Sequence, residues 1–291
     1  MTLMINMATL EHPVILPYPR DALRYKYFVR ESNQHQAKME LRTFKRLVEM
    51  FTKPGDTILD PMSGVGTVHF AKYMGRNSIA VEIVPGFVEL QRMNLESLEK
   101  VFQTGNFFRD FDSFGWDSTD NTGTHTILEG DNRRFLPLDN PVEAVIFSPP
   151  YGSLWSFSAK GRESKVSQEK NYVVGYDDNP QNIGNMKNYR QYLTAMKIVY
   201  QKCLQSLVPG GILVTVVKDY IQGGKRIPCS TDNLRMCIQA GLIPHMWLYR
   251  DASQTSSPFQ VKARKERIEA GKHNPELDIL LEDILVFKTP E

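Results

Sequence analysis

Four consecutive residues, Ser148-Pro149-Pro150-Tyr151, have the side chains in this 291-residue chain that are best suited to chemistry. A hydroxyl precedes the two prolines and an aromatic ring follows them, and the prolines fix the backbone so that nearby carbonyl groups point in set directions. Such a group can bind a flat heterocycle with an exocyclic amine: the ring stacks on one face, while the hydroxyl and a carbonyl accept the amine protons. Pro-Pro-Tyr also occurs in loops and polyproline ligands, so the rest of the chain must decide.

A second candidate is the glycine-rich run at residues 60–67, with the sequence Asp-Pro-Met-Ser-Gly-Val-Gly-Thr. Its glycines allow a ligand to approach the backbone closely and allow a tight turn into a helix. The run lacks the full Gly-x-Gly-x-x-Gly pattern and any Gly-Lys-Ser/Thr, which argues against a dinucleotide site and a P-loop. Asp60 suits a ligand with a cationic amine, such as the amino-acid end of S-adenosylmethionine. The alternative is a glycine turn in an ordinary strand–helix–strand unit.

Two further carboxylates stand at the ends of predicted strands. Glu82 follows the predicted strand at residues 78–81 and lies about 20 positions after the glycine run, where an acidic residue can bind ribose hydroxyls. Asp131 follows residues 126–128 and could face an adenine ring at the same sheet edge. The alternative for Asp131 is a turn carboxylate without contact to a ligand.

Apolar runs and turn residues predict the elements that must position these groups. The run at residues 144–147 ends in Pro-Pro, which indicates a buried strand that stops where its ladder donors are lost. The tetrapeptide therefore lies at the C-terminal edge of a sheet, where α/β folds bind their ligands. The predicted strands are residues 57–60, 78–81, 126–128, 142–147, 212–217, 246–249 and 284–287, the last two as an antiparallel pair. The predicted helices are residues 41–51, 68–73, 87–102, 189–207 and 232–240.

Four segments, in their order along the chain, resemble the motifs of the S-adenosylmethionine-dependent DNA amino-methyltransferases, the cytosine-N4 and adenine-N6 enzymes. Residues 60–67 resemble their Asp-Pro-Phe-x-Gly-x-Gly-Thr motif, and residues 148–151 resemble their catalytic motif in its Ser-Pro-Pro-Tyr form. Residues 35–38 and the helix after them resemble the segment that covers the methionine end of the cofactor. Residues 282–288 resemble the last strand of the family, so the resemblance runs from about residue 33 to the C-terminus.

The resemblance implies an α/β fold with a Rossmann-like, seven-stranded methyltransferase sheet. That sheet is mostly parallel with one antiparallel edge strand, has helices on both faces, and forms a single domain over residues 1–291. It implies S-adenosylmethionine as the cofactor. The cofactor-binding residues implied in this way are Lys38, Asp60, Pro61, Ser63, Gly64, Gly66, Thr67, Glu82 and Asp131.

The implied reaction is methyl transfer to the exocyclic amine of a DNA base that is flipped out of the duplex. The Ser148 hydroxyl and the Pro149 carbonyl would hold the amine protons. Tyr151, which follows Pro150 in the motif, would stack on the base. Neither a covalent enzyme intermediate nor a metal is needed. Serine in the first motif position is typical of cytosine-N4 enzymes, which favours cytosine. The alternatives are an adenine-N6 enzyme, an RNA methyltransferase acting on a guanine or adenine amine, and a non-catalytic DNA-binding partner.

Two long polar segments, residues 152–188 and 251–278, have no place in the predicted sheet and are candidate DNA-recognition insertions. Aromatic side chains stack on bases and cations pair with phosphates. The alternative for the second segment is a solvated helix face, because acidic residues are mixed in. A third basic patch near the N-terminus could equally be ordinary surface. The candidate DNA-binding residues are Trp155, Lys160, Arg162, Lys262, Arg264, Lys265 and Arg267, and the third patch is Arg20, Arg24, Lys26 and Arg30.

Composition sets wide bounds. A formal net charge of +2 neither demands nor excludes nucleic acid. The three cysteines have no metal-ligand spacing, and their odd number argues against a disulfide framework and for a reducing compartment. No apolar run approaches the roughly 18–20 residues of a membrane span, and no signal peptide is evident, so we expect a soluble cytoplasmic protein. The expected partner is double-stranded DNA. The small size favours a short palindromic target or a homodimer, and the sequence leaves open whether a restriction endonuclease accompanies the protein.

Overall fold

The structure is a computed structural model that describes most of the residues of the predicted sheet. The described residues are 14–18, 21, 23–34, 38–105, 122–150, 179–222, 225–252, 265–266, 268–271, 274–275 and 278–290. Most of the two predicted insertions falls outside this set. So do Tyr151, Trp155, Lys160, Arg162, Lys262, Arg264 and Arg267.

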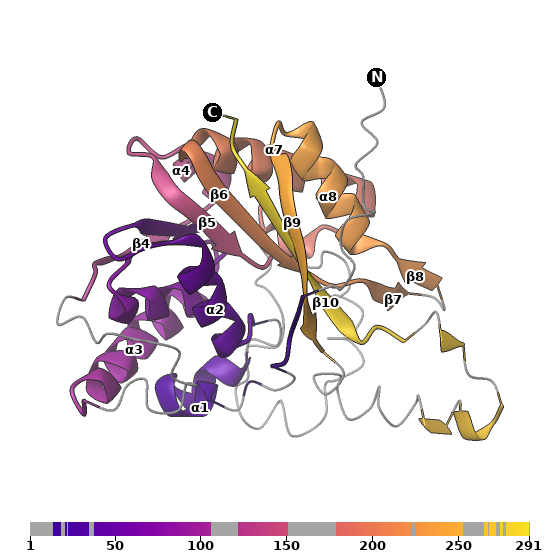
Figure 1. Cartoon of the computed structure of the whole chain (residues 1–291), viewed down its shortest axis with the longest axis horizontal. Helices are drawn as coiled ribbons and strands as arrows, with labels where there is room; N and C mark the ends of the chain where they lie inside the picture. Colours follow the sequence, from indigo (N-terminus) through magenta and orange to yellow (C-terminus); the bar gives the residue numbers. More distant parts are fainter. Residues whose placement is uncertain are drawn as a thin grey trace.

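The described residues form one large sheet with eight strands (Figure 1). In spatial order the strands are β1 (Ile15–Leu16), β9 (Ile243–Asp251), β10 (Leu281–Lys288), β6 (Leu207–Val217), β5 (Val142–Phe147), β2 (Thr57–Asp60), β3 (Asn77–Glu82) and β4 (His125–Glu129). All neighbours pair in parallel except β10, which is antiparallel to both β6 and β9. The parallel strands on either side of β2 place their carboxyl ends at a common edge, where the strand order reverses. This arrangement confirms the Rossmann-like methyltransferase sheet.

Two details of the predicted sheet are wrong. The sheet has eight strands and not seven, because the short strand β1 pairs with the end of β9 through Ile15 and Leu16. The reversed strand is not at the edge: β10 lies between β6 and β9, with β9 and β1 outside it. The predicted antiparallel pairing of the last two strands is confirmed, and β10 lies on the side of β9 that faces the centre of the sheet.

Helices cover both faces of the sheet, as expected, because the strands alternate apolar side chains between two cores. One core holds Ile284 and Val286 of β10 under α2 (Leu41–Phe51), the 3-10 helix η3 (Thr67–Met74) and α3 (Pro85–Phe102). The other holds Leu285 and Phe287 under α7 (Tyr189–Gln205) and α8 (Cys229–Gln239). Shorter helices are α1 (Arg24–Tyr27), η2 (Arg30–Gln34), α4 (Asn132–Phe135) and η4 (Ile183–Asn185). Figure 1 shows the two helical groups on either side of the sheet.

Three local elements differ from the sequence expectation. Residues 68–73 belong to a 3-10 helix, which lies between Gly66 and Gly75, both with positive φ. The helix expected at residues 189–207 ends at Gln205, and β6 begins at Leu207, before the Pro-Gly-Gly run that was expected to separate them. Residues 220–227 form a hairpin of β7 (Tyr220–Gln222) and β8 (Lys225–Ile227) that the sequence pattern did not predict.

Two predictions from the sequence concern disulfide bonds and membrane-spanning helices. Cys203, Cys229 and Cys237 are free thiols, and all three are buried in the helical side of the core. Among the described residues, no helix combines the length and the apolar character that crossing a membrane requires.

Candidate active site

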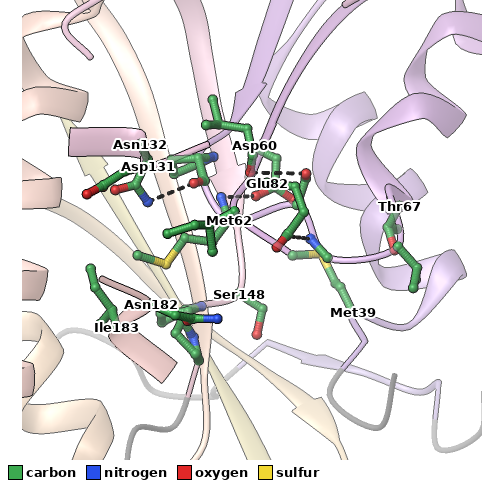
Figure 2. Close-up of a pocket in the computed structure, with 18 of the residues that line it drawn as sticks. Met39, Asp60, Met62, Thr67, Glu82, Asp131, Asn132, Ser148, Asn182 and Ile183 are labelled. Carbon is green, nitrogen blue, oxygen red and sulfur yellow. Dashed lines mark hydrogen bonds between the residues drawn. The ribbon is translucent and has the colours of Figure 1, made fainter. Parts of the chain in front are cut away.

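A single pocket at the carboxyl ends of β2, β3 and β5 brings the two predicted centres together (Figure 2). It encloses about 860 Å³ of empty space, including the part open to solvent. Every predicted cofactor residue except Gly66 lines it, and so do Ser148, Pro149 and Pro150. The lining residues predicted from the sequence are Lys38, Asp60, Pro61, Ser63, Gly64, Thr67, Glu82, Asp131, Ser148, Pro149 and Pro150.

Asp60 is the last residue of β2 and is almost completely buried at the floor of the pocket. Its Oδ1 accepts a hydrogen bond from the Met62 backbone N–H at 2.9 Å, and no cation pairs with it among the described residues. Burial raises the pKa of the Asp60 carboxyl to about 7. A buried carboxylate without a cationic partner is costly, so a ligand that brings a positive charge to this point would be strongly favoured.

Glu82 closes β3 and joins the glycine loop to the strand end. Its carboxylate accepts hydrogen bonds from the Gly64 N–H at 2.7 Å and from the Val84 N–H at 2.8 Å. Burial raises the pKa of Glu82 to about 8, against the opposing effect of these backbone donors. Glu82 therefore shapes the loop from one side while it lines the pocket on the other.

Two amide side chains of α3 hold the same loop from behind, and sequence reasoning missed both. Gln91 donates to Ser63 Oγ at 2.8 Å and to the Gly64 carbonyl at 2.7 Å, and its Oε1 lies 2.9 Å from Nε2 of His69. Asn94 donates to the Val65 carbonyl at 2.8 Å. Gln91 and Asn94 are fully buried. Their spacing of three on a helix with an apolar face was the available signal, since that spacing puts both on one side.

Gly66 does not line the pocket, but the loop requires a glycine there. Its φ is +79°, and a Cβ at this position would lie 2.6 Å from Cδ2 of His69 and 2.8 Å from Cγ of Gln91. Both the backbone conformation and the close packing exclude a larger residue. The structure thus gives Gly66 a role in loop shape and not in direct contact with the pocket.

The N-terminal segment forms a lip of the pocket through Lys38 and Met39. Arg24 fixes this lip: its Nη2 donates to the Met39 carbonyl at 2.5 Å and to Thr67 Oγ1 at 3.2 Å. Burial, reinforced by the charge of Arg24, lowers the pKa of Lys38 to about 8. Asn94 ties the segment further, because its Oδ1 accepts from the Val29 N–H at 3.0 Å and from Ser32 Oγ at 2.8 Å.

The prediction of a third basic patch near the N-terminus is therefore wrong, because Arg24 is not on the surface. Arg24 is only 1% exposed and pairs with Asp21 at 2.5 Å, so it is part of the support of the pocket. Lys26 and Arg30 are exposed, and Arg20 lies outside the described residues. A buried arginine and a surface arginine look alike in a sequence, because only the fold decides which one acquires a partner.

Asp131 both turns the chain and lines the pocket, and its contact with an adenine ring stays a prediction. Its carboxylate caps α4 by accepting the Arg133 N–H at 2.9 Å, and it pairs with the Arg133 guanidinium at 2.8 Å. The next residue, Asn132, donates from Nδ2 to the Pro61 carbonyl at 2.8 Å. Asn132 Oδ1 is a buried acceptor without a hydrogen-bond partner among the described residues. Asn132 also lines the pocket and was not predicted.

Ser148 follows β5 directly and projects into the opposite side of the pocket from Asp60 and Glu82 (Figure 2). Its hydroxyl donates to the Val216 carbonyl of β6 at 2.9 Å. Because the single hydroxyl proton is used in this bond, the oxygen lone pairs remain as acceptors. Asn182 and Ile183 complete this side of the pocket at the start of η4. They were not predicted, because they belong to a segment that was expected to be an insertion.

Comparison with known proteins gives a family match over the cofactor side of this pocket. Residues 18–93 match the model of the N6/N4 DNA methylases. The Type II methyltransferase M.BglI of Bacillus subtilis is 37% identical over 70 residues, which are 24% of this chain and 20% of that protein. The N-terminal quarter of the chain is thus similar to the N6/N4 DNA methylases. The match covers only a fifth of the length of that relative, and Ser148 lies outside the family segment.

Solved structures also resemble this chain. A Listeria monocytogenes protein described as a class I S-adenosylmethionine-dependent methyltransferase has a TM-score of 0.47 and 15% identity, covering 89% of this chain and 62% of that one. TrmN from Thermus thermophilus has a TM-score of 0.45 and 12% identity, covering 89% and 52%. The fold assignment rests on the strand order and directions, and not on these scores.

Proposed function

We propose that this protein transfers a methyl group from S-adenosylmethionine to the exocyclic N4 amine of cytosine in DNA. The observation that carries the proposal is one pocket in which the unpaired Asp60 carboxylate and Glu82 face the acceptor oxygen of Ser148. The family match supports a DNA methylase. The first half of the pocket suits a ligand with an amine and ribose hydroxyls, and the second half suits an amine-bearing heterocycle.

Each half of the pocket has a distinct task. S-adenosylmethionine, when bound, supplies a methyl group on a positively charged sulfur. Asp60 would hold its amino-acid ammonium, Glu82 its ribose hydroxyls, and Lys38 with Met39 would cover its methionine end. Ser63, Gly64 and Thr67 would form the loop against which it lies, with Pro61 and Asp131 on the side of the base.

On the target side, Ser148 Oγ and the Pro149 carbonyl would accept the two amine protons. The amine lone pair is delocalised into the ring, and these acceptors favour the tetrahedral nitrogen that can attack the methyl carbon. The bound cofactor would supply the methyl group, and the amine nitrogen held by these acceptors would lose one proton in the overall transfer. Rate enhancement comes from positioning and electrostatics. Tyr151, which lies outside the described residues, is our candidate for stacking on the flipped base.

Cytosine is preferred to adenine because serine, and not aspartate or asparagine, opens the catalytic motif. Adenine-N6 and an RNA amine are the alternative substrates. We place the whole chain in one methyltransferase domain, with Trp155, Lys160, Arg162, Lys262, Arg264 and Arg267 as DNA contacts in segments outside the described residues. Lys265 is described and is exposed beside the equally exposed Glu266.

The test is to incubate the purified protein with labelled S-adenosylmethionine and either unmethylated genomic DNA or total RNA. The nucleic acid is then digested to nucleosides, and the product is identified by mass spectrometry. N4-methylcytosine in DNA is the expected product. N6-methyladenine would retain the mechanism and change the base, label in RNA alone would replace the substrate, and a protein that neither binds the cofactor nor transfers label would contradict the proposal.

A further inference from the structure

The β7–β8 hairpin stands at the same sheet edge as Ser148. It follows β6 directly, and the Val216 carbonyl of β6 is the group that accepts the Ser148 hydroxyl proton at 2.9 Å. Only residues 217–219 separate that carbonyl from the first residue of β7. Figure 1 shows the hairpin projecting to the right of the sheet, next to the start of α8. The hairpin is therefore joined through β6 to the strand that holds Ser148.

The base of the hairpin is firmly anchored. Asp219 accepts from Nε of Arg226 at 2.8 Å and from the Ser230 N–H of α8 at 2.9 Å. The Ser230 hydroxyl donates in turn to Asp283 at 2.5 Å, and Asp283 also accepts from Trp247 Nε1 at 2.9 Å. This chain of bonds joins the hairpin to α8, β9 and β10, so its surface side chains have a fixed base.

The first turns of α7 and α8 meet beside the hairpin, since Tyr189 OH donates to Asp232 at 3.0 Å. Exposed cations gather on these elements: Lys187, Arg190, Lys225 and Arg226, which we call the hairpin patch. Lys187, Arg190 and Lys225 have no ion pair among the described residues. The acidic groups nearby, Asp219 and Asp232, have side chains only 9% and 17% exposed, so the surface itself is positive.

Two cations of the hairpin patch lie at a helix N-terminus, where a positive charge lowers the stability of the helix. Lys187 and Arg190 flank the N-terminus of the 17-residue helix α7, whose first turn contains no acidic residue. The helix dipole makes cations unfavourable at an N-terminus and anions favourable. Asn188 caps this helix end, because its Oδ1 accepts from the Arg190 N–H at 2.9 Å and from the Gln191 N–H at 3.3 Å. The attraction for an anion on this surface therefore comes from the lysine and arginine side chains.

We infer that the hairpin patch binds backbone phosphates of duplex DNA beside the flipped target base. The inference rests on the proposed function. The cations belong to two separate elements, which suits a row of phosphates along a duplex. Contacts of this kind set the position of the protein on DNA and carry no sequence information. Of the four patch residues, Lys187 lies near the end of the predicted insertion at residues 152–188, whereas Arg190, Lys225 and Arg226 lie outside both insertions.

The test is a double variant, Lys187→Ala with Lys225→Ala, that leaves the paired Arg226 in place. Binding to a 30-base-pair duplex is measured by fluorescence anisotropy over a range of salt concentrations, and S-adenosylmethionine affinity by calorimetry. We expect weaker duplex binding and a salt slope smaller by about 2, about one unit for each lost phosphate contact. The S-adenosylmethionine affinity should be unchanged, because neither residue lines the pocket.

The matched control is Lys53→Ala with Lys100→Ala, two exposed lysines that precede β2 and end α3, at the other edge of the sheet. The control should keep the wild-type slope. A patch variant that binds DNA like the wild type, while the wild type methylates DNA, would overturn this inference alone. A wild type that neither binds nor methylates DNA, or that binds only RNA, would overturn the proposed function as well.

Discussion

The two halves of the pocket are built differently. On the side of β2 and β3, buried side chains hold the glycine loop from several directions: Glu82 holds Gly64, Gln91 holds Ser63 and Gly64, and Asn94 holds Val65. On the side of β5, Ser148 is fixed by a single bond to Val216. A site held in its binding geometry before the ligand arrives avoids part of the ordering cost of binding. The half beside β2 and β3, our proposed cofactor half, is therefore held in shape by contacts within the protein. The half that contains Ser148, our proposed target half, depends more on the substrate.

The largest expected effect separates the two halves. Asp60→Asn keeps an oxygen for the Met62 N–H and removes the charge, so we expect S-adenosylmethionine affinity to fall by roughly 30- to 100-fold, the range for one charge-assisted contact. Ser148→Ala should lower turnover by about 100-fold or more with little change in that affinity, because it removes an acceptor used in the transition state. Calorimetry and single-turnover methylation measure the two effects.

The melting temperature supplies the control for both variants. Asp60 is buried without a cation, so the Asp60→Asn protein should be as stable as the wild type or more so. A variant that loses affinity and stability together would indicate misfolding. Equal losses of cofactor affinity in both variants would show that the division into two halves is wrong.

The next effect tests the support of the loop. Gln91→Leu removes the donors to Ser63 and Gly64, and we expect S-adenosylmethionine affinity to fall by about 10-fold, the size of one or two lost hydrogen bonds. Asn233→Leu is the matched control: Asn233 is equally buried, on α8, and its partners are Cys229 and Tyr200. Both variants should lose stability, but only Gln91→Leu should lose affinity in the folded protein. Equal losses of affinity would make Gln91 merely structural.

The pH dependence of cofactor binding should reveal the charge of Asp60. Burial raises its pKa to about 7 in the empty site, so at pH 6 the carboxyl is mostly protonated and cannot pair with an ammonium group. The ionised fraction changes roughly tenfold between pH 6 and pH 8, and affinity should rise by a similar factor. Calorimetry across this pH range measures the affinity. In Asp60→Asn the affinity should depend on pH only through the titration of Glu82.

The stability of the empty protein should change with pH in the opposite direction. A carboxyl whose pKa is raised by folding binds more protons in the native state, so its stabilising contribution is complete below the unfolded pKa, near 4. This contribution is lost as the pH rises through about 7 for Asp60 and about 8 for Glu82. Thermal melting of the empty protein should therefore show falling stability between pH 5 and pH 8, and saturating S-adenosylmethionine should oppose the fall.

Sequence alone predicted the elements whose ends are marked by strong local signals. β5 runs from Val142 to Phe147, as predicted, because Pro141 and the Ser-Pro-Pro run bound its apolar residues. The strand ends then placed Asp60, Glu82 and Ser148 at one edge, and the pocket contains all three. Parallel strands with short loops leave little freedom in this edge.

Other features depend on contacts between distant parts of the chain. β1 has two residues, too few for a periodic pattern, and it exists because β9 offers a partner. β6 begins at Leu207 because that residue pairs with Val142, in spite of the Pro-Gly-Gly run that follows. Gln91 and Asn94 resemble ordinary polar positions of a helix until the glycine loop is packed against them. Their spacing of three indicates that they share one side of α3, but it does not reveal that the glycine loop packs against that side.

The smallest expected effect asks whether the target half has a hidden support of its own. Tyr200 packs its ring against Phe147, the residue before Ser148, at 5.8 Å between ring centroids, and its hydroxyl lies 2.6 Å from Asn233 Oδ1 and 3.3 Å from Thr215 Oγ1. Tyr200→Phe keeps the ring and leaves Asn233 Oδ1 unsatisfied. We expect a loss of about 1–2 kcal/mol and a melting temperature lower by roughly 2–6 °C.

Turnover by Tyr200→Phe should equal that of the wild type, because packing and not the hydroxyl supports Phe147. Tyr200→Leu, which removes the ring, is the comparison variant and should lower turnover at a temperature where both proteins are folded. If Tyr200→Phe alone slows methyl transfer without changing S-adenosylmethionine affinity, the buried bonds behind β5 position Ser148. Buried hydrogen bonds would then hold the target half in shape, as they hold the cofactor half. The two halves would differ only in where these bonds lie.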